Sequence, residues 1–208
     1  MGKGFFISFE GGEGAGKTTQ IKKLAQYLES KGHDVVTTRE PGGTPAADAL
    51  WQCFIDQKGH EWDVLAQTLL VFTTRRLHVE ERLKKDLAAG KVIICDRFTD
   101  STRVYQGIAG GLGLERVEQI KQMCIGDFEP DLTFIFDIDP KIGLARSERR
   151  NNGKDTFEEK HIEFHEMLRN GYRDIANTHQ DRCFVIDASQ SIEAVEEEIR
   201  DICLKNLI

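Results

Sequence analysis

The sequence predicts an α/β protein in which a parallel sheet of five strands is flanked by helices. Strand and helix patterns alternate along the 208 residues, and this alternation is typical of a doubly wound sheet. Directly after the first strand pattern, residues 11–18 read G-x-x-x-x-G-K-[ST], the P-loop motif that binds phosphate groups. The length fits one domain over residues 1–208 with room for a large core.

The first predicted strand, residues 5–9, is apolar and aromatic almost throughout, as expected of a buried parallel strand. A helix is expected to begin at about Lys17, because Ile21, Leu24 and Leu28 recur at helical spacing. Strand, glycine-rich loop and helix therefore follow in the order that a P-loop requires. A glycine-rich turn that binds nothing is the alternative, but it would not need this context.

The loop supplies the groups that a nucleotide polyphosphate needs. Its glycines let backbone N–H groups point at phosphate oxygens, and the helix N-terminus adds a partial positive charge. Lys17 is expected to reach the β- and γ-phosphates as a catalytic residue, and the Thr18 hydroxyl is expected to bind Mg²⁺. The expected ATP-binding residues are Gly11, Gly12, Glu13, Gly14, Ala15, Gly16, Lys17, Thr18 and Thr19.

A second strand is predicted over residues 34–38, and a loop of glycine and proline follows it at residues 39–44. Ligands bind at the carboxyl edge of open α/β sheets, so Arg39 lies where a guanidinium could hold a phosphate. The alternative is a solvated turn residue.

Helices are predicted over residues 46–57 and 62–87. Phe72 and Arg76 of the second helix are four residues apart and share a face. A ring and a guanidinium placed in this way suit a planar heterocycle, which one stacks on and the other hydrogen-bonds. A core Phe beside a surface Arg is the alternative.

A third buried strand is predicted at residues 92–95 and ends in Asp96 and Arg97. A carboxylate in this position next to a P-loop can hold Mg²⁺ or its water, as in the Walker B arrangement. A predicted helix over residues 101–106 then places Ser101 and Tyr105 on the side of Arg97, because the three recur at four-residue steps.

The remaining pattern gives a helix at 114–125, strands at 132–136 and 182–187, and a final helix at 192–204. Between the last two strands, residues 146–155 carry Arg146, Arg149, Arg150 and Lys154 around Asn-Asn-Gly. We expect a mobile basic lid, at about residues 146–158, that closes over polyphosphate. An arginine-rich helix end, favourable through the helix dipole, is the alternative.

The net charge and the cysteine content restrict the partners, metal sites and location to be expected of this protein. The net charge of −7 argues against nucleic acid and membrane surfaces as partners. Five scattered cysteines without a C-x-x-C pair indicate reduced core thiols and no cysteine metal site. No signal peptide or membrane-spanning run is evident, so we expect a cytoplasmic protein.

Four motifs together resemble the bacterial thymidylate kinase family over nearly the full length. They are F-E-G-G-E-G-A-G-K-T-T (9–19), T-R-E-P-G-G-T (38–44), D-R-F-T-D-S-T-R-V-Y-Q-G (96–107) and G-D-F-E-P-D-L-T (126–133). The resemblance implies a nucleoside-monophosphate-kinase fold, a homodimer, and the Mg²⁺-dependent reaction of ATP with dTMP to give ADP and dTDP. This reaction would contribute to dTTP supply for DNA synthesis.

The resemblance also implies roles for the residues of the acceptor site. Arg39 and Arg97 would hold the dTMP phosphate, Phe72 would stack on thymine, and Arg76 would bond its edge. Residues that would line the base and sugar are Ser101, Tyr105 and Gln106, with Tyr105 crowding the 2′ position and so favouring deoxyribose. The P-loop carboxylate, Glu13, would lie near the acceptor nucleotide and the metal.

The family includes a form in which lid arginines replace a P-loop arginine, and this sequence resembles that form. Gly14 and Ala15 leave the P-loop without arginine, so Arg149 and Arg150 are the catalytic candidates of the lid. Which of them acts stays open, because Thr156 stands where many members have another arginine. Arg103 would add a charge beside the acceptor site.

The sequence leaves two alternatives: another nucleotide kinase, or, from a different class, a GTPase-like switch or a non-catalytic nucleotide-binding regulator. A kinase for another nucleoside monophosphate or a deoxynucleoside would share most of these motifs, and an acceptor screen would separate it. A GTPase-like switch should carry N-K-x-D, which the sequence lacks. A non-catalytic nucleotide-binding regulator would bind ATP without turnover.

Overall fold

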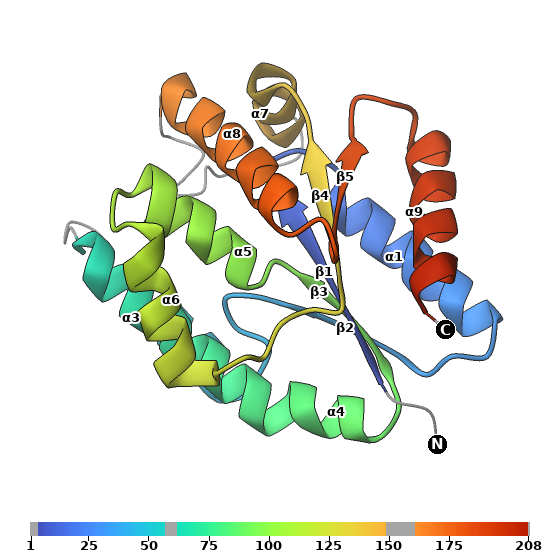
Figure 1. The fold of residues 1–208 in the computed structure, drawn as a ribbon, viewed down its shortest axis with the longest axis horizontal. Coiled ribbons are helices and arrows are strands. Elements are labelled where there is room, and N and C mark those ends of the chain that lie inside the picture. The colour runs from blue at the N-terminus through green and yellow to red at the C-terminus, as the bar shows by residue number, and fades with distance from the viewer. Residues whose placement is uncertain (1–3, 57–61, 149–160, 208) are drawn as a thin grey trace.

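The computed structural model describes residues 4–56, 62–148 and 161–207. Five strands form one sheet in the order β2-β3-β1-β4-β5, and every neighbouring pair is parallel (Figure 1). The strands are β1 (Phe5–Gly11), β2 (Val35–Arg39), β3 (Val92–Asp96), β4 (Leu132–Asp137) and β5 (Cys183–Asp187). The predicted five-stranded parallel sheet is confirmed.

Helices cover both faces of the sheet (Figure 1). On one face lie α1 (Lys17–Ser30) and α9 (Ile192–Asn206). The other described helices are α2 (Pro45–Asp56), α3 (Val64–His78), α4 (Lys84–Ala88), α5 (Thr99–Thr102), α6 (Leu114–Ile125), α7 (Pro140–Glu148) and α8 (Ile162–Thr178). Of the described helices, none is long and apolar enough to cross a bilayer.

Two of the predicted helices are longer or less regular than expected. The predicted helix at 62–87 consists of α3, a π-helical segment η1 (Val79–Leu83) and α4. The predicted helix at 101–106 begins earlier, with α5, and continues as a second π-helical segment, η2 (Arg103–Ala109). Segments of π-helix are frequent at functional sites, and η2 carries the candidate residues Tyr105 and Gln106.

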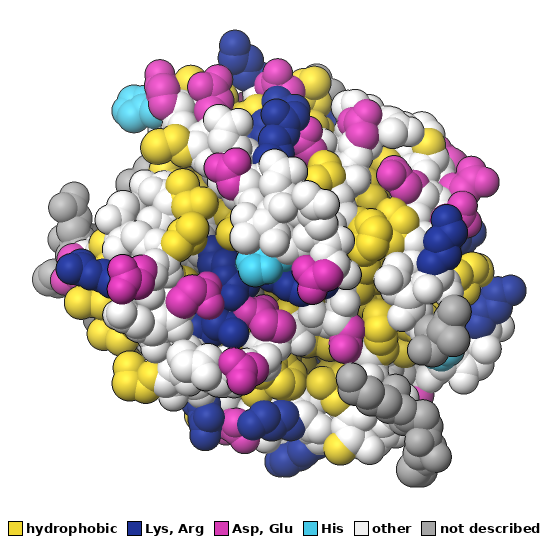
Figure 2. Space-filling model, viewed as in Figure 1, with side chains coloured by type: hydrophobic (Ala, Val, Ile, Leu, Met, Phe, Trp, Pro, Cys, Tyr) yellow, Lys and Arg dark blue, Asp and Glu magenta, His cyan; other side chains and the backbone are white. Residues whose placement is uncertain are grey.

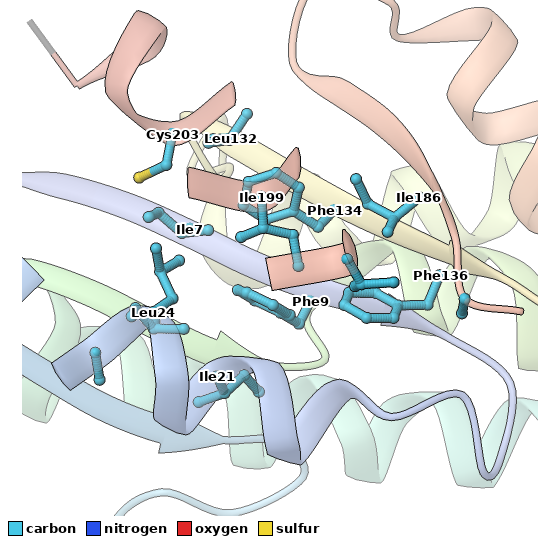
Figure 3. Packing of buried hydrophobic residues seen from close by; sticks show 14 of the residues in the cluster. Ile7, Phe9, Ile21, Leu24, Leu132, Phe134, Phe136, Ile186, Ile199 and Cys203 are labelled. Carbon is cyan, nitrogen blue, oxygen red and sulfur yellow. The ribbon is translucent and has the colours of Figure 1, made fainter. Parts of the chain in front are cut away.

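The central strands are buried on both faces, which explains their continuous apolar sequence. From β1, Ile7 and Phe9 point to the α1 and α9 face, where they meet Leu24 and Phe134 (Figure 3). Phe6 points the other way and packs with a separate cluster that includes η1. This alternation of side chains fixes the register of β1 between β3 and β4.

The register brings the site together at the carboxyl edge of the sheet. Phe9 pairs with Asp96, and Arg39 on the outer strand pairs with the same residue. The loop after β1 therefore lies beside the ends of β2 and β3, the edge at which open α/β sheets bind ligands. The expected lid begins within the last turn of α7, and residues 149–158 lie outside the described residues.

Candidate active site

The loop between β1 and α1 curls tightly because three of its glycines have positive φ: 133° at Gly11, 66° at Gly14 and 94° at Gly16. Lys17, the first residue of α1, folds back over this loop. Its Nζ donates to the carbonyl oxygens of Gly11 at 3.1 Å and Gly12 at 3.0 Å. Burial lowers the pKa of Lys17, and its ammonium lies at the surface that phosphate would occupy in a P-loop.

The phosphate loop packs backbone to backbone against α7. A Cβ on Gly14 would lie 1.8 Å from the carbonyl oxygen of Gly143, so this contact requires glycine. From the other side, a Cβ on Gly143 would lie 2.5 Å from the carbonyl oxygen of Glu13. The helix that leads into the expected lid is therefore seated directly on the loop.

The two predicted metal residues lie together. Thr18 Oγ1 donates to Asp96 Oδ2 at 3.3 Å, across the gap between α1 and the end of β3. Among the described residues, no three His, Cys, Asp or Glu side chains group closely enough to hold a metal ion alone. One hydroxyl and one carboxylate fit the usual kind of Mg²⁺ site, in which water and substrate phosphate oxygens supply the remaining ligands.

Arg97 follows β3 with φ of 70°, which is uncommon for a residue other than glycine. Its guanidinium turns toward the phosphate loop. One terminal nitrogen, Nη1, donates to the Gly11 carbonyl at 2.9 Å, the Ser101 hydroxyl at 3.2 Å and the Tyr172 hydroxyl at 3.1 Å. The other, Nη2, donates to Glu13 Oε1 at 2.6 Å. Arg97 therefore joins β1, β3, α5 and α8.

Glu13 connects the phosphate loop to this network. Its Oε1 also accepts the hydroxyl of Tyr105 at 3.0 Å. Burial alone would raise the pKa of Glu13, but the charges of Arg97 and Lys17 lower it to about 2. Glu13 is consequently a carboxylate at neutral pH.

A cavity of about 240 Å³ opens beside Arg97. Six of the predicted substrate-binding residues line it: Glu13, Arg39, Arg97, Ser101, Tyr105 and Gln106. Arg39 lies at an exposed edge, where its side chain bonds Asp48 at 3.2 Å and the Pro41 carbonyl at 2.9 Å. Residues that the sequence analysis did not single out also line the cavity: Glu40, Pro41, Trp51, Phe54, Gln67, Val71, Arg75, Phe98 and Thr102.

The structure does not bring Phe72 and Arg76, which were expected at this cavity, into its wall. Neither occurs among the described residues that line it. Phe72 is fully buried against α6 and its neighbours, and Arg76 is half exposed, donating to the Cys124 carbonyl at 2.8 Å. One residue earlier on α3, Val71 and Arg75 face the cavity instead. The four-residue spacing showed that Phe72 and Arg76 share one face of α3, but it could not show which face of α3 lines the cavity.

Arg75 is 2% exposed and belongs to a buried polar cluster. It donates to Glu40 Oε2 at 2.6 Å, Thr102 Oγ1 at 3.0 Å and the Phe98 carbonyl at 3.1 Å. Its guanidinium lies 4.8 Å from the Phe72 ring centroid, so Phe72 supports Arg75 from behind. The sequence held one signal for Arg75: Arg75 and Arg76 are adjacent, so they point to different sides of the predicted helix, and either could have faced the cavity.

Arg103 also differs from the expectation. Its side chain does not line the cavity beside Arg97 and pairs with Asp100 at 2.7 Å, Glu118 at 2.6 Å and Glu129 at 2.5 Å. Asp100 in turn pairs with Arg182 at 2.7 Å, so the positive charge of Arg103 is balanced within a buried network of ion pairs.

A second cavity, of about 420 Å³, lies on the other side of the phosphate loop. It is bounded by Gly14, Ala15 and Gly16 of the loop and by the segment between β5 and α9. Arg146 lines it and donates to the Ala188 carbonyl at 3.0 Å. The other two lid arginines, Arg149 and Arg150, lie outside the described residues.

Residues of one phosphate loop thus line two cavities, Glu13 the first and Gly14 to Gly16 the second, while the buried Lys17 folds over the same loop and Arg97 lines the first cavity. This arrangement defines a P-loop phosphotransferase that acts between two nucleotides. The family model for thymidylate kinase matches residues 9–199. The chain belongs to the thymidylate kinase family, and the family expected from the motifs is confirmed.

Individual relatives agree over the full length. The thymidylate kinase of Caulobacter vibrioides is 45% identical over 207 residues, which cover 100% of this chain and 99% of the relative. That of Ruegeria pomeroyi is 40% identical, with 99% and 97% covered. The crystal structure of thymidylate kinase from Ehrlichia chaffeensis superposes with a TM-score of 0.76 at 34% identity, covering 97% and 99% of the two chains.

The site also contains a buried carboxyl group with an unusual pKa. Glu10 accepts the Phe98 N–H at 2.7 Å and the Ser101 hydroxyl at 2.5 Å. Burial and the negative charge of Asp100 raise the pKa of Glu10 to about 7. The folded state therefore binds a proton at Glu10 more tightly than the unfolded chain does.

We predict that Glu10 makes stability fall as pH rises. Between pH 4.5 and 7 the folded state holds the proton that the unfolded state releases, so the free energy of unfolding decreases through this range. Glu10→Gln should remove up to about 3 kcal/mol of the decrease between pH 5 and pH 8. Urea unfolding of both proteins at the two pH values measures it. Identical pH dependence of the two proteins would contradict the assignment.

Proposed function

We propose that the chain transfers the γ-phosphoryl group of ATP to dTMP, giving ADP and dTDP, with the acceptor in the cavity beside Arg97 and the donor in the cavity beside α9. The observation that carries this assignment is the placement of one phosphate loop between two cavities. Transfer needs two nucleotides whose phosphates meet in line, and the loop with Lys17 lies where they would meet. We propose that residues 1–208 form one catalytic domain.

Arg97 and Arg39 would hold the phosphate of dTMP. Arg97 is oriented by several hydrogen bonds at once, so it loses little conformational freedom when a phosphate arrives. Tyr105 donates to Glu13 and stands in the cavity wall, where its ring would crowd a 2′-hydroxyl and favour deoxyribose. Ser101 and Gln106 would line the base and sugar.

ATP would bind through residues 11–19, with Lys17 on its β- and γ-phosphates and its base in the cavity beside α9. Thr18 and Asp96 would hold Mg²⁺, directly or through water, and the ion would supply charge neutralisation at the phosphate oxygens. The acceptor phosphate is already a nucleophile, so the protein needs no general base. Its own contribution is position and positive charge.

Three further features belong to the proposal. We propose a homodimer, in line with the family resemblance. Helix α3 exposes Leu65 and Leu69 one turn apart, with 45% and 44% of each residue accessible.

The five cysteines are free thiols, which suits a cytoplasmic location. Acidic and basic side chains are interspersed across the face in Figure 2, and with the net charge of −7 this disfavours nucleic acid or membrane surfaces as partners.

We predict that dTMP is the preferred acceptor and that Lys17 is essential. Release of ADP from Mg-ATP should be fastest with dTMP in a panel of dTMP, dUMP, dCMP, dGMP and AMP. Lys17→Ala should reduce turnover by orders of magnitude while circular dichroism stays unchanged, because Lys17 neutralises phosphate charge.

The exposed Lys31→Ala variant at the end of α1 serves as the control and should keep wild-type turnover. Preference for another acceptor would reassign the substrate. ATP binding without turnover for any acceptor would indicate a regulator instead of a kinase.

We predict that Arg149 or Arg150 supplies the charge that the P-loop lacks. Because a lid arginine acts mainly in the transition state, Arg149→Ala or Arg150→Ala should lower kcat and kcat/KM together, with little change in either KM. Arginines in this role contribute about 10³–10⁵ in rate in other nucleotidases.

Arg146→Ala is the matched comparison. Arg146 lines the donor cavity, so its loss should act through the KM for ATP. Wild-type kcat in both Arg149→Ala and Arg150→Ala would refute the lid assignment and make Lys154 the next candidate.

A further inference from the structure

The base of the acceptor lacks the aromatic partner expected from the sequence. Phe72 is fully buried behind Arg75, and Phe98, which lines the cavity, is 0% exposed. The α3 residues that line the cavity are Gln67, Val71 and Arg75, and none of them carries an aromatic ring. A planar base in this cavity must therefore find its stacking surface on another element.

Helix α2 carries aromatic side chains in the cavity wall. Trp51 and Phe54, three residues apart on α2, both line the cavity and both are half-buried. Their rings are stacked, with centroids 4.9 Å apart and an interplanar angle of 20°. Trp62 meets Phe54 edge-on at 5.5 Å and 72°, which holds the Phe54 ring from outside.

Core packing does not explain this pair. The structure describes every residue of α2, and of these Ala47 alone is buried. Large aromatic rings that stay partly exposed leave apolar area in water, and covering that area is favourable. A ligand ring that enters the cavity would cover it.

The distribution of charge in the cavity fits a nucleotide whose base lies toward Trp51 and Phe54 and whose phosphate lies toward Arg97. Arg97 and Arg39 form a cationic end, and Asp48, the partner of Arg39, lies on α2 three residues before Trp51. Moving along α2 from Asp48 to Phe54 therefore leads from the phosphate-binding end to the aromatic end over about 9 Å. A nucleoside monophosphate is likewise anionic at one end and planar at the other.

We propose that Trp51 and Phe54 form the surface on which the pyrimidine ring of dTMP stacks, so that the stacking group of this chain lies on α2 instead of α3. The inference rests on the proposed acceptor cavity. Stacking on a π-face tolerates any planar base, so the pair contributes affinity, and groups at the edge of the ring select thymine.

Tryptophan fluorescence gives a direct test, because the chain contains two tryptophans, Trp51 and Trp62. In a Trp62→Phe background all tryptophan emission comes from Trp51. Titration with dTMP should change this emission, whereas deoxyribose 5-phosphate, which has the phosphate and sugar but no base, should not. Equal responses to both ligands, or none to dTMP at concentrations that saturate turnover, would overturn the proposal.

Kinetics provides the second arm. Trp51→Ala and Phe54→Ala should each raise the KM for dTMP about 5- to 150-fold, the range measured for loss of one base-stacking aromatic, and leave the KM for ATP unchanged. Trp51→Phe should restore most of the affinity because it keeps a π-face. Ile55→Ala, on the same helix but exposed and outside the cavity, is the matched control and should behave as wild type.

The outcomes separate this inference from the proposed function. A wild-type protein that does not phosphorylate dTMP would refute the function itself. Wild-type turnover of dTMP with an unchanged KM in both alanine variants would refute the stacking role alone. Should Trp51→Ala fail to fold, Trp51→Leu and the fluorescence titration decide the same question.

Discussion

The left-handed backbone of Arg97 is the constraint on which the proposed acceptor site depends. A non-glycine residue with φ of 70° costs about 1–2 kcal/mol, so the surroundings must hold it in place. Its N–H donates to the Phe9 carbonyl at 2.9 Å, and the N–H of Phe98 donates to the Glu10 carboxyl group. With the backbone fixed in this way, the guanidinium points across the sheet edge at the phosphate loop and not into solvent.

The hydrogen bonds of Arg97 connect the apolar core to the proposed acceptor site. Tyr172, which accepts from Arg97, is 2% exposed and packs in an apolar cluster with Val104 and Leu168. Ser101 connects Arg97, Tyr172 and Glu10 through one hydroxyl. Because packed interiors do not deform continuously, the arginine is held where an acceptor phosphate would bind before any ligand arrives. The fold therefore preorganises Arg97 in the proposed acceptor site.

Much of the fold and part of the site followed from local patterns. Apolar strand runs predicted the sheet, and the motif at residues 11–18 predicted the phosphate loop, because both are encoded by neighbouring residues. The phase of α3 could not be predicted in this way. Its apolar Leu65 and Leu69 are exposed, while polar Thr68, Arg75 and His78 are buried. Thr68 donates to the Val64 carbonyl one turn earlier on the same helix, but Arg75 and His78 both pair with Glu40, 35 and 38 residues away in sequence, which helical periodicity does not register. Trp51 could not be predicted for the same reason, because its proposed role depends on a cavity wall that other elements also build.

Replacement of Arg97 by lysine tests the central claim most directly, because Arg97→Lys keeps the charge and removes the planar set of donors. We expect kcat/KM for dTMP to fall roughly 10²–10³-fold, the scale for losing a preorganised donor, while the calorimetric Kd for ADP stays at its wild-type value. Wild-type efficiency with dTMP, or an equal loss of ADP affinity, would contradict the assignment of Arg97 to the acceptor phosphate.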